Sequence, residues 1–222
     1  MEISALMTLA LGAAWASGLN LYAAAAVLGI LGATGQMTLP PDMQILSHPA
    51  MIGVAVVMYS IEFVTDKLPG LDSTWDAIHS FIRIPAGAVL AAAAMGDVGF
   101  AAQAAAFLLG GGIAAASHAV KAGTRVMINT SPEPFSNWGA SVAEDGLVIG
   151  GLSLAVFYPV GFLVLFAGFV LFAVWILPRI VRGVKGLWNR LRGRKDTAAP
   201  ADTPRASDGR PTLEPGDRQS PD

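Results

Sequence analysis

The stretch VGFLVLFAGFVLFAVWILP at residues 160–178 is nineteen residues long and contains no charged side chain. A hydrocarbon core about 30 Å thick needs about 20 apolar residues in an α-helix, which rises about 1.5 Å per residue. The stretch therefore predicts a membrane-spanning helix that faces lipid. The rest of the 222-residue chain agrees, since 54% of its residues are hydrophobic and 14% are charged. We predict an all-α, polytopic transmembrane helical bundle.

Basic residues crowd directly after this stretch. Between 179 and 195 they are Arg179, Arg182, Lys185, Arg190, Arg192, Arg194 and Lys195. Apolar residues recur at helical spacing through 179–192, which predicts a basic amphipathic helix at the membrane interface, attracted by anionic lipid at about 1 kcal/mol per basic residue. Residues 193–222 are rich in proline and charge and are predicted to be a disordered cytoplasmic tail. Lipid, and not nucleic acid, is the expected partner of this region.

Upstream, residues 1–178 form one predicted transmembrane domain with about six spans. The expected spans are 3–34, 48–66, 72–96, 99–128, 137–157 and 160–178. The first is interrupted by Ser-Gly-Leu-Asn at 17–20, so it is either one long kinked helix or a re-entrant helical hairpin, and the sequence leaves both open. A match between residues 12–17 and 112–117 leaves open a 3+3 inverted repeat.

The distribution of Lys and Arg predicts the orientation. The cluster at 179–195 belongs on the cytoplasmic side, and the loops at 35–47 and 97–98, which lack Lys and Arg, belong outside. With six crossings both termini are expected to be cytoplasmic, in the inner membrane of a cell. The chain starts Met-Glu-Ile-Ser, without a basic leader, so its first apolar stretch is expected to be retained. No cysteine is present, which excludes disulfides and thiolate sites.

Ionisable residues recur at helical spacing inside four of the predicted spans. An ionisable group at the centre of a span costs about 2.5–3.5 kcal/mol, so such residues usually face an interior or a water-filled cavity. Asp66, Lys67 and Asp72 are expected to be solvated loop ends. The candidate ion- or solute-binding residues are Glu62, Asp76, His79, Arg83, His118, Lys121, Arg125, Glu144 and Asp145.

Two interpretations of these residues stay open, a solute cavity and a salt-bridge network that only holds helices together. Seven carboxylates face four Lys or Arg in this part of the chain, and the surplus of three favours a proton or a metal cation over an anion. Glu144 is the predicted binding group, with Glu62 as its acidic neighbour. Alternatively, Glu144 is permanently paired with Lys121 or Arg125. The spacing of the histidines is not typical of a zinc site, so no metal, cofactor or catalytic residue is predicted.

Several segments together resemble one family. They are ASGLNLYA at 16–23, EFVTDK at 62–67, WDAIHSFIRIPAG at 75–87, SHAVKAGTR at 117–125, NTSPEPFSNW at 129–138 and AED at 143–145. This set is similar to the bacterial membrane family known as domain of unknown function 4126, over about residues 5–160. The resemblance implies a membrane location and a helical architecture, and it implies no activity.

Taken together, the sequence favours a small transporter or permease-like protein that handles an ion, a proton or a polar solute through a charged cytoplasmic-side cavity. A membrane-embedded enzyme acting on lipid head groups is the alternative, followed by a structural membrane assembly factor. Transport is favoured over catalysis, but composition and spacing do not decide between them. Homo-oligomers are left open.

Overall fold

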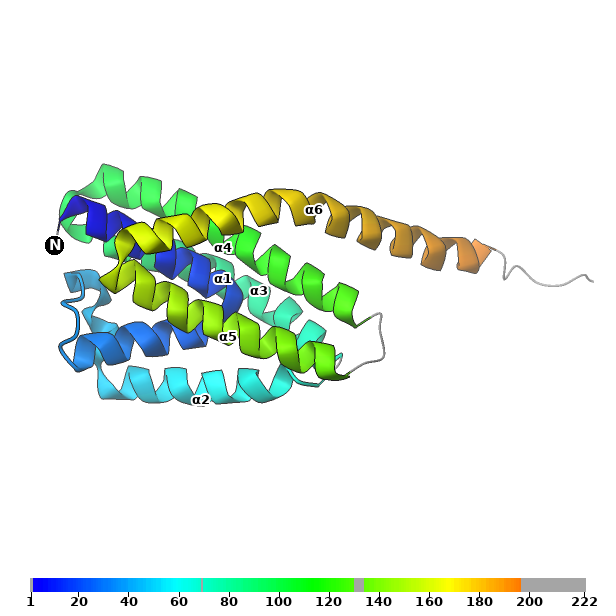
Figure 1. Cartoon of the computed structure of the whole chain (residues 1–222), viewed down its shortest axis with the longest axis horizontal. Coiled ribbons are helices and arrows are strands. Elements are labelled where there is room, and N and C mark those ends of the chain that lie inside the picture. The colour runs from blue at the N-terminus through cyan, green and yellow to red at the C-terminus, as the bar shows by residue number, and fades with distance from the viewer. Residues whose placement is uncertain (1, 69, 130–133, 197–222) are drawn as a thin grey trace, which may run out of the picture. The chain divides into compact units, whose positions relative to one another are not determined.

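The computed structural model of the chain describes residues 2–68, 70–129 and 134–196. In these ranges it contains only helices, which confirms the predicted fold class (Figure 1). The α-helices are α1 (Ile3–Ala33), α2 (Pro49–Thr65), α3 (Leu71–Ala94), α4 (Phe100–Ile128), α5 (Pro134–Phe157) and α6 (Pro159–Asp196). Two short 3₁₀-helices, η1 (Pro41–Ser47) and η2 (Gly96–Val98), lie between them.

The chain divides into two compact units, Met1–Gly183 and Val184–Asp222. The first unit holds α1 to α5 and most of α6. In the second unit the described residues, 184–196, are the last turns of α6, and the helix runs without a break through Pro178. The predicted boundary between a span and an interfacial helix is therefore not marked by an end of a helix. Of the predicted tail, residues 197–222 lie outside the described part of the chain.

Five helical segments are long and apolar enough to cross a membrane. They are Ile3–Ala33, Leu71–Ala94, Phe100–Ile128, Phe135–Phe157 and Pro159–Gly183. The pair formed by η1 and α2, bent by 67°, passes the same test together. Length and composition thus support a polytopic helical membrane bundle.

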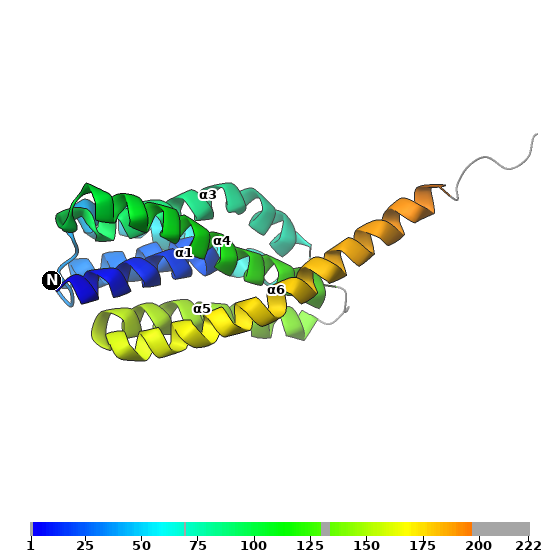
Figure 2. The same cartoon turned by 90° about the horizontal axis from the view of Figure 1, so that it is seen from above.

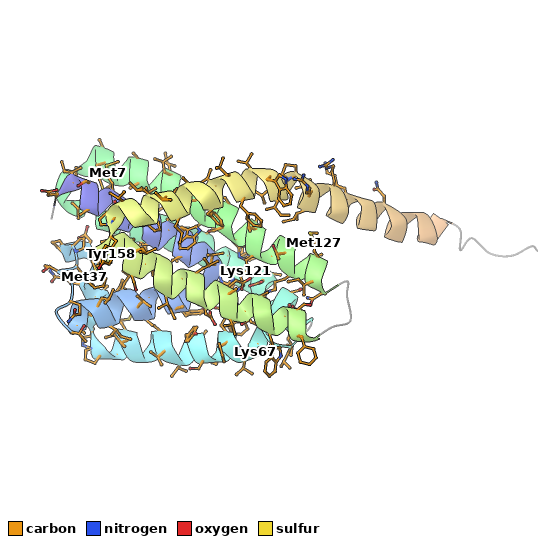
Figure 3. All side chains as sticks on the ribbon, viewed as in Figure 1. Met7, Met37, Lys67, Lys121, Met127 and Tyr158 are labelled. Carbon is orange, nitrogen blue, oxygen red and sulfur yellow. The ribbon has the colours of Figure 1, made fainter. Side chains whose placement is uncertain are left out.

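Helix α1 is folded back on itself at Asn20, whose φ of −150° and ψ of 95° are not helical. Its first half begins at the end of the bundle where α3 finishes, since Met7 shares a pocket with Met95 and Ala102. Its second half returns to that end, where Gly32 abuts Leu39 next to η1. Figure 3 shows Met7, Met37 and Tyr158 at one end of the bundle, and Lys67 and Met127 at the other. Of the two alternatives left open by the sequence, α1 is the re-entrant hairpin.

The hairpin changes the predicted topology. Because the chain turns back at Asn20, only α2, α3, α4, α5 and α6 cross the bundle, as the two views show (Figures 1 and 2). The start of α1 then lies at one end of the bundle, and Ile180 of α6, which contacts Gly123 in the second half of α4, lies toward the other. The expectation of six crossings with both termini on one side is corrected to five crossings with the termini on opposite sides.

The same observation bears on the inverted repeat. Residues 12–17 lie in the first half of the hairpin, whereas the matching residues 112–117 lie within α4, which has no break from Phe100 to Ile128. The two stretches pack against each other, with Gly18 against Ser117 and Ala114. They therefore do not occupy equivalent places in two related units, and the sequence match has no counterpart in these helices.

The apolar core lies around the first half of α1. Trp15 is fully buried and makes edge-on contacts with Phe162 and Phe169 of α6, at ring-centroid distances of 6.0 Å and 5.7 Å. Small residues let α3 and α4 approach α1, since a Cβ added at Gly110 would meet Ala91 and would lie 3.1 Å from the Gly87 carbonyl oxygen. Helix α6 thus packs on the core through a few aromatic residues, and most of its predicted lipid face is exposed.

Candidate functional site

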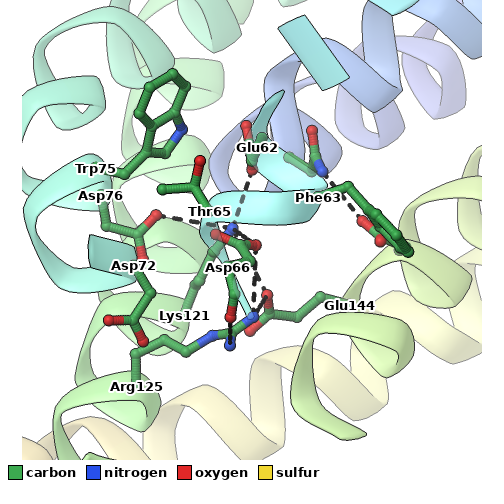
Figure 4. A network of polar contacts seen from close by, with 12 residues as sticks. Glu62, Phe63, Thr65, Asp66, Asp72, Trp75, Asp76, Lys121, Arg125 and Glu144 are labelled. Atoms are coloured by element: carbon green, nitrogen blue, oxygen red, sulfur yellow. Dashed lines mark hydrogen bonds and ion pairs between the residues drawn. The ribbon is translucent and has the colours of Figure 1, made fainter. Parts of the chain in front are cut away.

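Seven charged side chains from four elements meet at the end of the bundle opposite to η1. The cations are Arg83 on α3 and Lys121 and Arg125 on α4, and the acids are Glu62 and Asp66 at the end of α2, Asp76 on α3 and Glu144 on α5 (Figure 4). We call these seven residues the charged network. All three cations have fully buried side chains.

Arg83 joins α3 to α2. Its guanidinium lies 2.8 Å from a carboxylate oxygen of Glu62 and 2.7 Å from one of Asp76, which is two turns earlier on the same helix. The spacing of Asp72, Asp76, His79 and Arg83 predicts that they share one face, and all four side chains are buried. The charge of Arg83 is therefore compensated inside the bundle, where an isolated cation is expensive.

Lys121 lies at the centre of the charged network. Its Nζ donates to Glu62 and Asp66, each at 3.0 Å, and lies 3.6 Å from a carboxylate oxygen of Glu144 and 3.7 Å from one of Asp76. One ammonium group thus faces acids from α2, α3 and α5.

Arg125 follows one turn later on the same face of α4. Its Nη2 lies 2.8 Å from Glu144 and 3.5 Å from Asp66, and its Nη1 donates to the backbone carbonyls of Asp66 and Asn137 at 3.0 Å and 3.2 Å. The guanidinium consequently ties the end of α2 and the start of α5 to α4.

The short connection between α2 and α3 carries two acids that were expected to be solvated. Asp66 and Asp72 are instead 2% and 0% exposed, and this expectation is corrected. Gly70, with a φ of +89°, lets the chain turn sharply, and Asp72 then accepts hydrogen bonds from the backbone N–H groups of Gly70 and Ser73. Asn129, at the end of α4, donates to the same carboxylate and covers it.

Asp66 and Lys67 lie outside the spanning helices and respond to burial in opposite ways. Burial raises the pKa of the Asp66 carboxyl, although the Lys121 cation acts against it. Lys67 is half-buried, and burial lowers its pKa. Its ammonium donates to the Phe63 carbonyl at 2.9 Å and lies 2.8 Å from the centroid of the Phe63 ring. Asp66 thus belongs to the charged network, whereas Lys67 remains at its rim.

The tip of the α1 hairpin adjoins the charged network. The Ser17 hydroxyl donates to the backbone carbonyl of Arg83 at 2.9 Å, and the Asn20 amide donates to Asp145 at 3.1 Å. Glu144 and Asp145 are adjacent on α5 but point to different places, Glu144 into the charged network and Asp145 to the hairpin tip.

Two of the predicted site residues, the histidines, lie beside the charged network. His118 Nε2 and the Ser80 hydroxyl are 2.5 Å apart, and His79 is stacked on Trp75 with its Nδ1 2.9 Å from the Trp75 carbonyl oxygen. Among the described residues no group of three or more His, Asp or Glu side chains has an arrangement that could hold a metal ion. Glu62, Asp76, Arg83, Lys121, Arg125 and Glu144 are brought together as the sequence suggests.

Sequence reasoning missed three partners of these residues. Asp66 was assigned to solvent because it borders a Pro-Gly turn, and Asn20 was read only as a helix breaker. Asn129 donates to both carboxylate oxygens of Asp72 and accepts from Asn137. The available signal for Asn20 was an amide side chain in the middle of an otherwise apolar stretch, where a polar group needs a partner.

The charged network contains one more acid than cations. Four carboxylates face three cations, and one oxygen each of Glu62, Asp66 and Asp76 accepts no hydrogen bond. If every group is ionised, the charged network carries a net charge of −1. One proton or one monovalent cation would therefore neutralise it.

The model of a family described as "Domain of unknown function (DUF4126)" matches residues 7–179. The chain belongs to this family. The match includes the hairpin, the charged network and the part of α6 that contacts the core. No curated protein and no solved structure matches the chain. Membership of the DUF4126 family thus confirms the resemblance found in the sequence and leaves the activity to be argued from the site.

Proposed function

We propose that this DUF4126 protein is a small membrane transporter that moves protons, or a small cation in exchange for protons, through the charged network. The proposal includes an inner-membrane location, with the charged network toward the cytoplasm because Arg and Lys concentrate at that end of the bundle. The start of α1 then faces the opposite side of the membrane.

The observation that carries the proposal is the net negative charge of a buried site. Charged groups inside a bundle cost several kcal/mol unless they are paired, and a network that only held helices together would be cheapest with equal numbers of acids and cations. Here the acids outnumber the cations by one, and three carboxylate oxygens have no hydrogen-bond donor. An exchangeable proton or cation supplies what this arrangement lacks.

The break in α1 supports the same proposal. Transporters commonly bind substrates where helices are interrupted near the middle of the membrane, because the interruption frees polar backbone groups and allows movement. In this chain the interruption is at Asn20, and neighbouring Ser17 bonds to the backbone of Arg83 in the charged network. A change in the charge of the network can therefore act on the hairpin.

Glu144 is the acid through which protons would enter. Its side chain is 13% exposed, whereas those of Glu62, Asp66 and Asp76 are 0%, 3% and 1% exposed. It is also held by Arg125 at 2.8 Å, which is the pairing that a purely structural role requires. Geometry alone fits both roles, and measurement of proton movement separates them.

The test uses the full chain in lipid vesicles that contain a pH-sensitive dye, under an imposed pH, Na⁺ or K⁺ gradient. Wild type is expected to move protons, and Glu144→Gln is expected to abolish the movement, because the variant leaves three acids for three cations and no surplus charge. Asp42→Asn is the matched control, since Asp42 is an exposed carboxylate near η2, bonded to Gln103 at 3.3 Å.

The control is expected to move protons at the wild-type rate. If wild type moves none under any of the three gradients, or if folded Glu144→Gln moves them as fast as wild type, the transport proposal is wrong. In either case the charged network is a tie between α2, α3, α4 and α5.

A further inference from the structure

Asp145 differs from the other buried acids in having no cation of its own. Its side chain is 7% exposed, it forms no ion pair within the described part of the chain, and its Oδ2 has no hydrogen-bond partner. Its Oδ1 accepts from Asn20 at the break of the hairpin. Asp72, by comparison, is covered by two backbone N–H groups and the Asn129 amide.

The orientation of the Asn20 amide is determined by its own second contact. Its Oδ1 accepts from the backbone N–H of Ala23 at 2.9 Å, so its Nδ2 must face Asp145 as a donor. The amide therefore satisfies one oxygen of the carboxyl group and can do nothing for the other.

A second buried oxygen on the same face of α5 lacks a partner. Ser141 lies one turn before Asp145, its side chain is 1% exposed, and its Oγ makes no hydrogen bond. Two unpartnered oxygens at i and i+4 on a buried face leave acceptors without donors. A proton on Asp145 supplies a donor there.

Other charged or titratable groups act on Asp145 from a greater distance. Tyr59 of α2 interacts with the carboxyl group, Lys67 and Asp66 follow at the end of α2, and Lys121 approaches from α4. Lys121 already serves Glu62 and Asp66 at 3.0 Å, and Lys67 donates to the Phe63 carbonyl. Both cations are thus committed elsewhere, and Glu144, the neighbour in the chain, adds a further negative charge.

We infer that Asp145 is a proton-binding site of its own, at the tip of the re-entrant hairpin, and that its carboxyl group is protonated in this conformation. A neutral carboxylic acid is far cheaper than a carboxylate in a buried place without a cation. The inference rests on the proposed function and deepens it, because it names a second proton-exchanging group where the hairpin meets α5. Loss of that proton would leave an unpaired charge facing the hairpin tip.

The experiment is infrared spectroscopy of the full chain in lipid vesicles at neutral pH. A protonated carboxylic acid has a carbonyl stretching band that an ionised carboxylate lacks. We expect this band in wild type, its loss in Asp145→Asn, and its retention in Glu144→Gln. The amide that replaces Asp145 keeps an oxygen acceptor for Asn20, so the variant retains the contact that holds the tip.

Asn20→Ala provides a second measurement that does not depend on folding of the first variant. It removes the donor to Oδ1, so the Asp145 carbonyl band is expected to move to higher frequency. A wild-type spectrum without the band, an unchanged band in Asp145→Asn, or an unmoved band in Asn20→Ala would overturn the inference.

These outcomes separate the inference from the transport proposal. Proton movement in vesicles without an Asp145 band removes this site and leaves transport through the charged network. An Asp145 band without proton movement removes the transport proposal and leaves a buried proton-binding site.

Discussion

The two ends of the bundle are built from opposite materials. At the end that carries η1 and η2, contacts are made by alanine, glycine and leucine around Trp15. At the other end, α2 to α5 meet through buried carboxylates, ammonium and guanidinium groups. Helix α4 takes part in both, with Gly110 and Ala114 in its first part and Lys121 and Arg125 in its second.

The difference shows what each end can tolerate. Close-packed small residues leave no room for an added atom, but they involve no charge that could be stranded. The charged network has large side chains that can shift, but removal of any one group leaves an opposite charge buried and unpaired. Four experiments would break or sharpen this contrast.

The largest effect is expected from labelling of single cysteines, which is all or none. The chain has no native cysteine among its 222 residues. Cysteines at Glu2 and Gln44 should react with an impermeant reagent from the same side of the membrane, because the hairpin returns α1 to the end at which it starts. A cysteine at Leu68 should react only from the other side. Equal accessibility of Glu2 and Leu68, opposite to Gln44, would contradict the hairpin.

At the charged end, Arg83→Leu should reduce the free energy of unfolding by about 3–5 kcal/mol, because it leaves Glu62 and Asp76 buried without their cation. Thermal unfolding in detergent measures the effect. Arg179→Leu is the control, since the Arg179 guanidinium only contacts Trp175 on the surface of α6. Equal losses for the two variants would show that the charged network stabilises nothing.

At the apolar end, Gly110→Ala should cost about 1–3 kcal/mol, because the added methyl group would collide with Ala91 and press on the Gly87 carbonyl. Gly112→Ala, two residues further along α4, has no atom within 4 Å of the added group. It should be neutral or stabilising by up to about 1 kcal/mol, since alanine is the better helix former. The same melting assay distinguishes them, and a tolerated Gly110→Ala would count against close packing at this end.

The smallest effect is expected at the rim of the charged end. Lys67 is half-buried and bonds only within its own turn, so Lys67→Met should change the free energy of unfolding by no more than about 1 kcal/mol. Lys121→Met, which strands Glu62 and Asp66, should cost about 3–5 kcal/mol. A loss at Lys67 as large as the loss at Lys121 would extend the charged network to the surface.

Much of the site could be predicted from helical spacing alone. The intervals between Asp72, Asp76 and Arg83 place them on one face, and Lys121 and Arg125 follow the same rule on α4. Spacing within one helix says nothing about the loop that follows it. Asp66 and Asp72 were therefore assigned to water, although the turn at Gly70 folds their segment against α4 and buries both.

The topology went wrong for a related reason. Apolar length predicts that residues 3–34 belong in the membrane, but a run of 31 helical residues can cross once or turn back halfway. Asn20 decides for the hairpin by leaving helical geometry and by bonding to Ala23 and Asp145. The second of these contacts spans 125 positions of the chain and cannot be read from a local pattern.

By itself, the sequence determined the solvent of this protein, its helical class and the faces on which its ionisable residues lie, because apolar length and helical periodicity are local properties. Only the tertiary structure decided which acid meets which cation. Each such pair is a contact between helices, and its formation depends on how those helices pack. The folding back of α1 and the separation of Glu144 from Asp145 into two environments were decided in the same way, by contacts among α1, α4 and α5 that no single segment encodes.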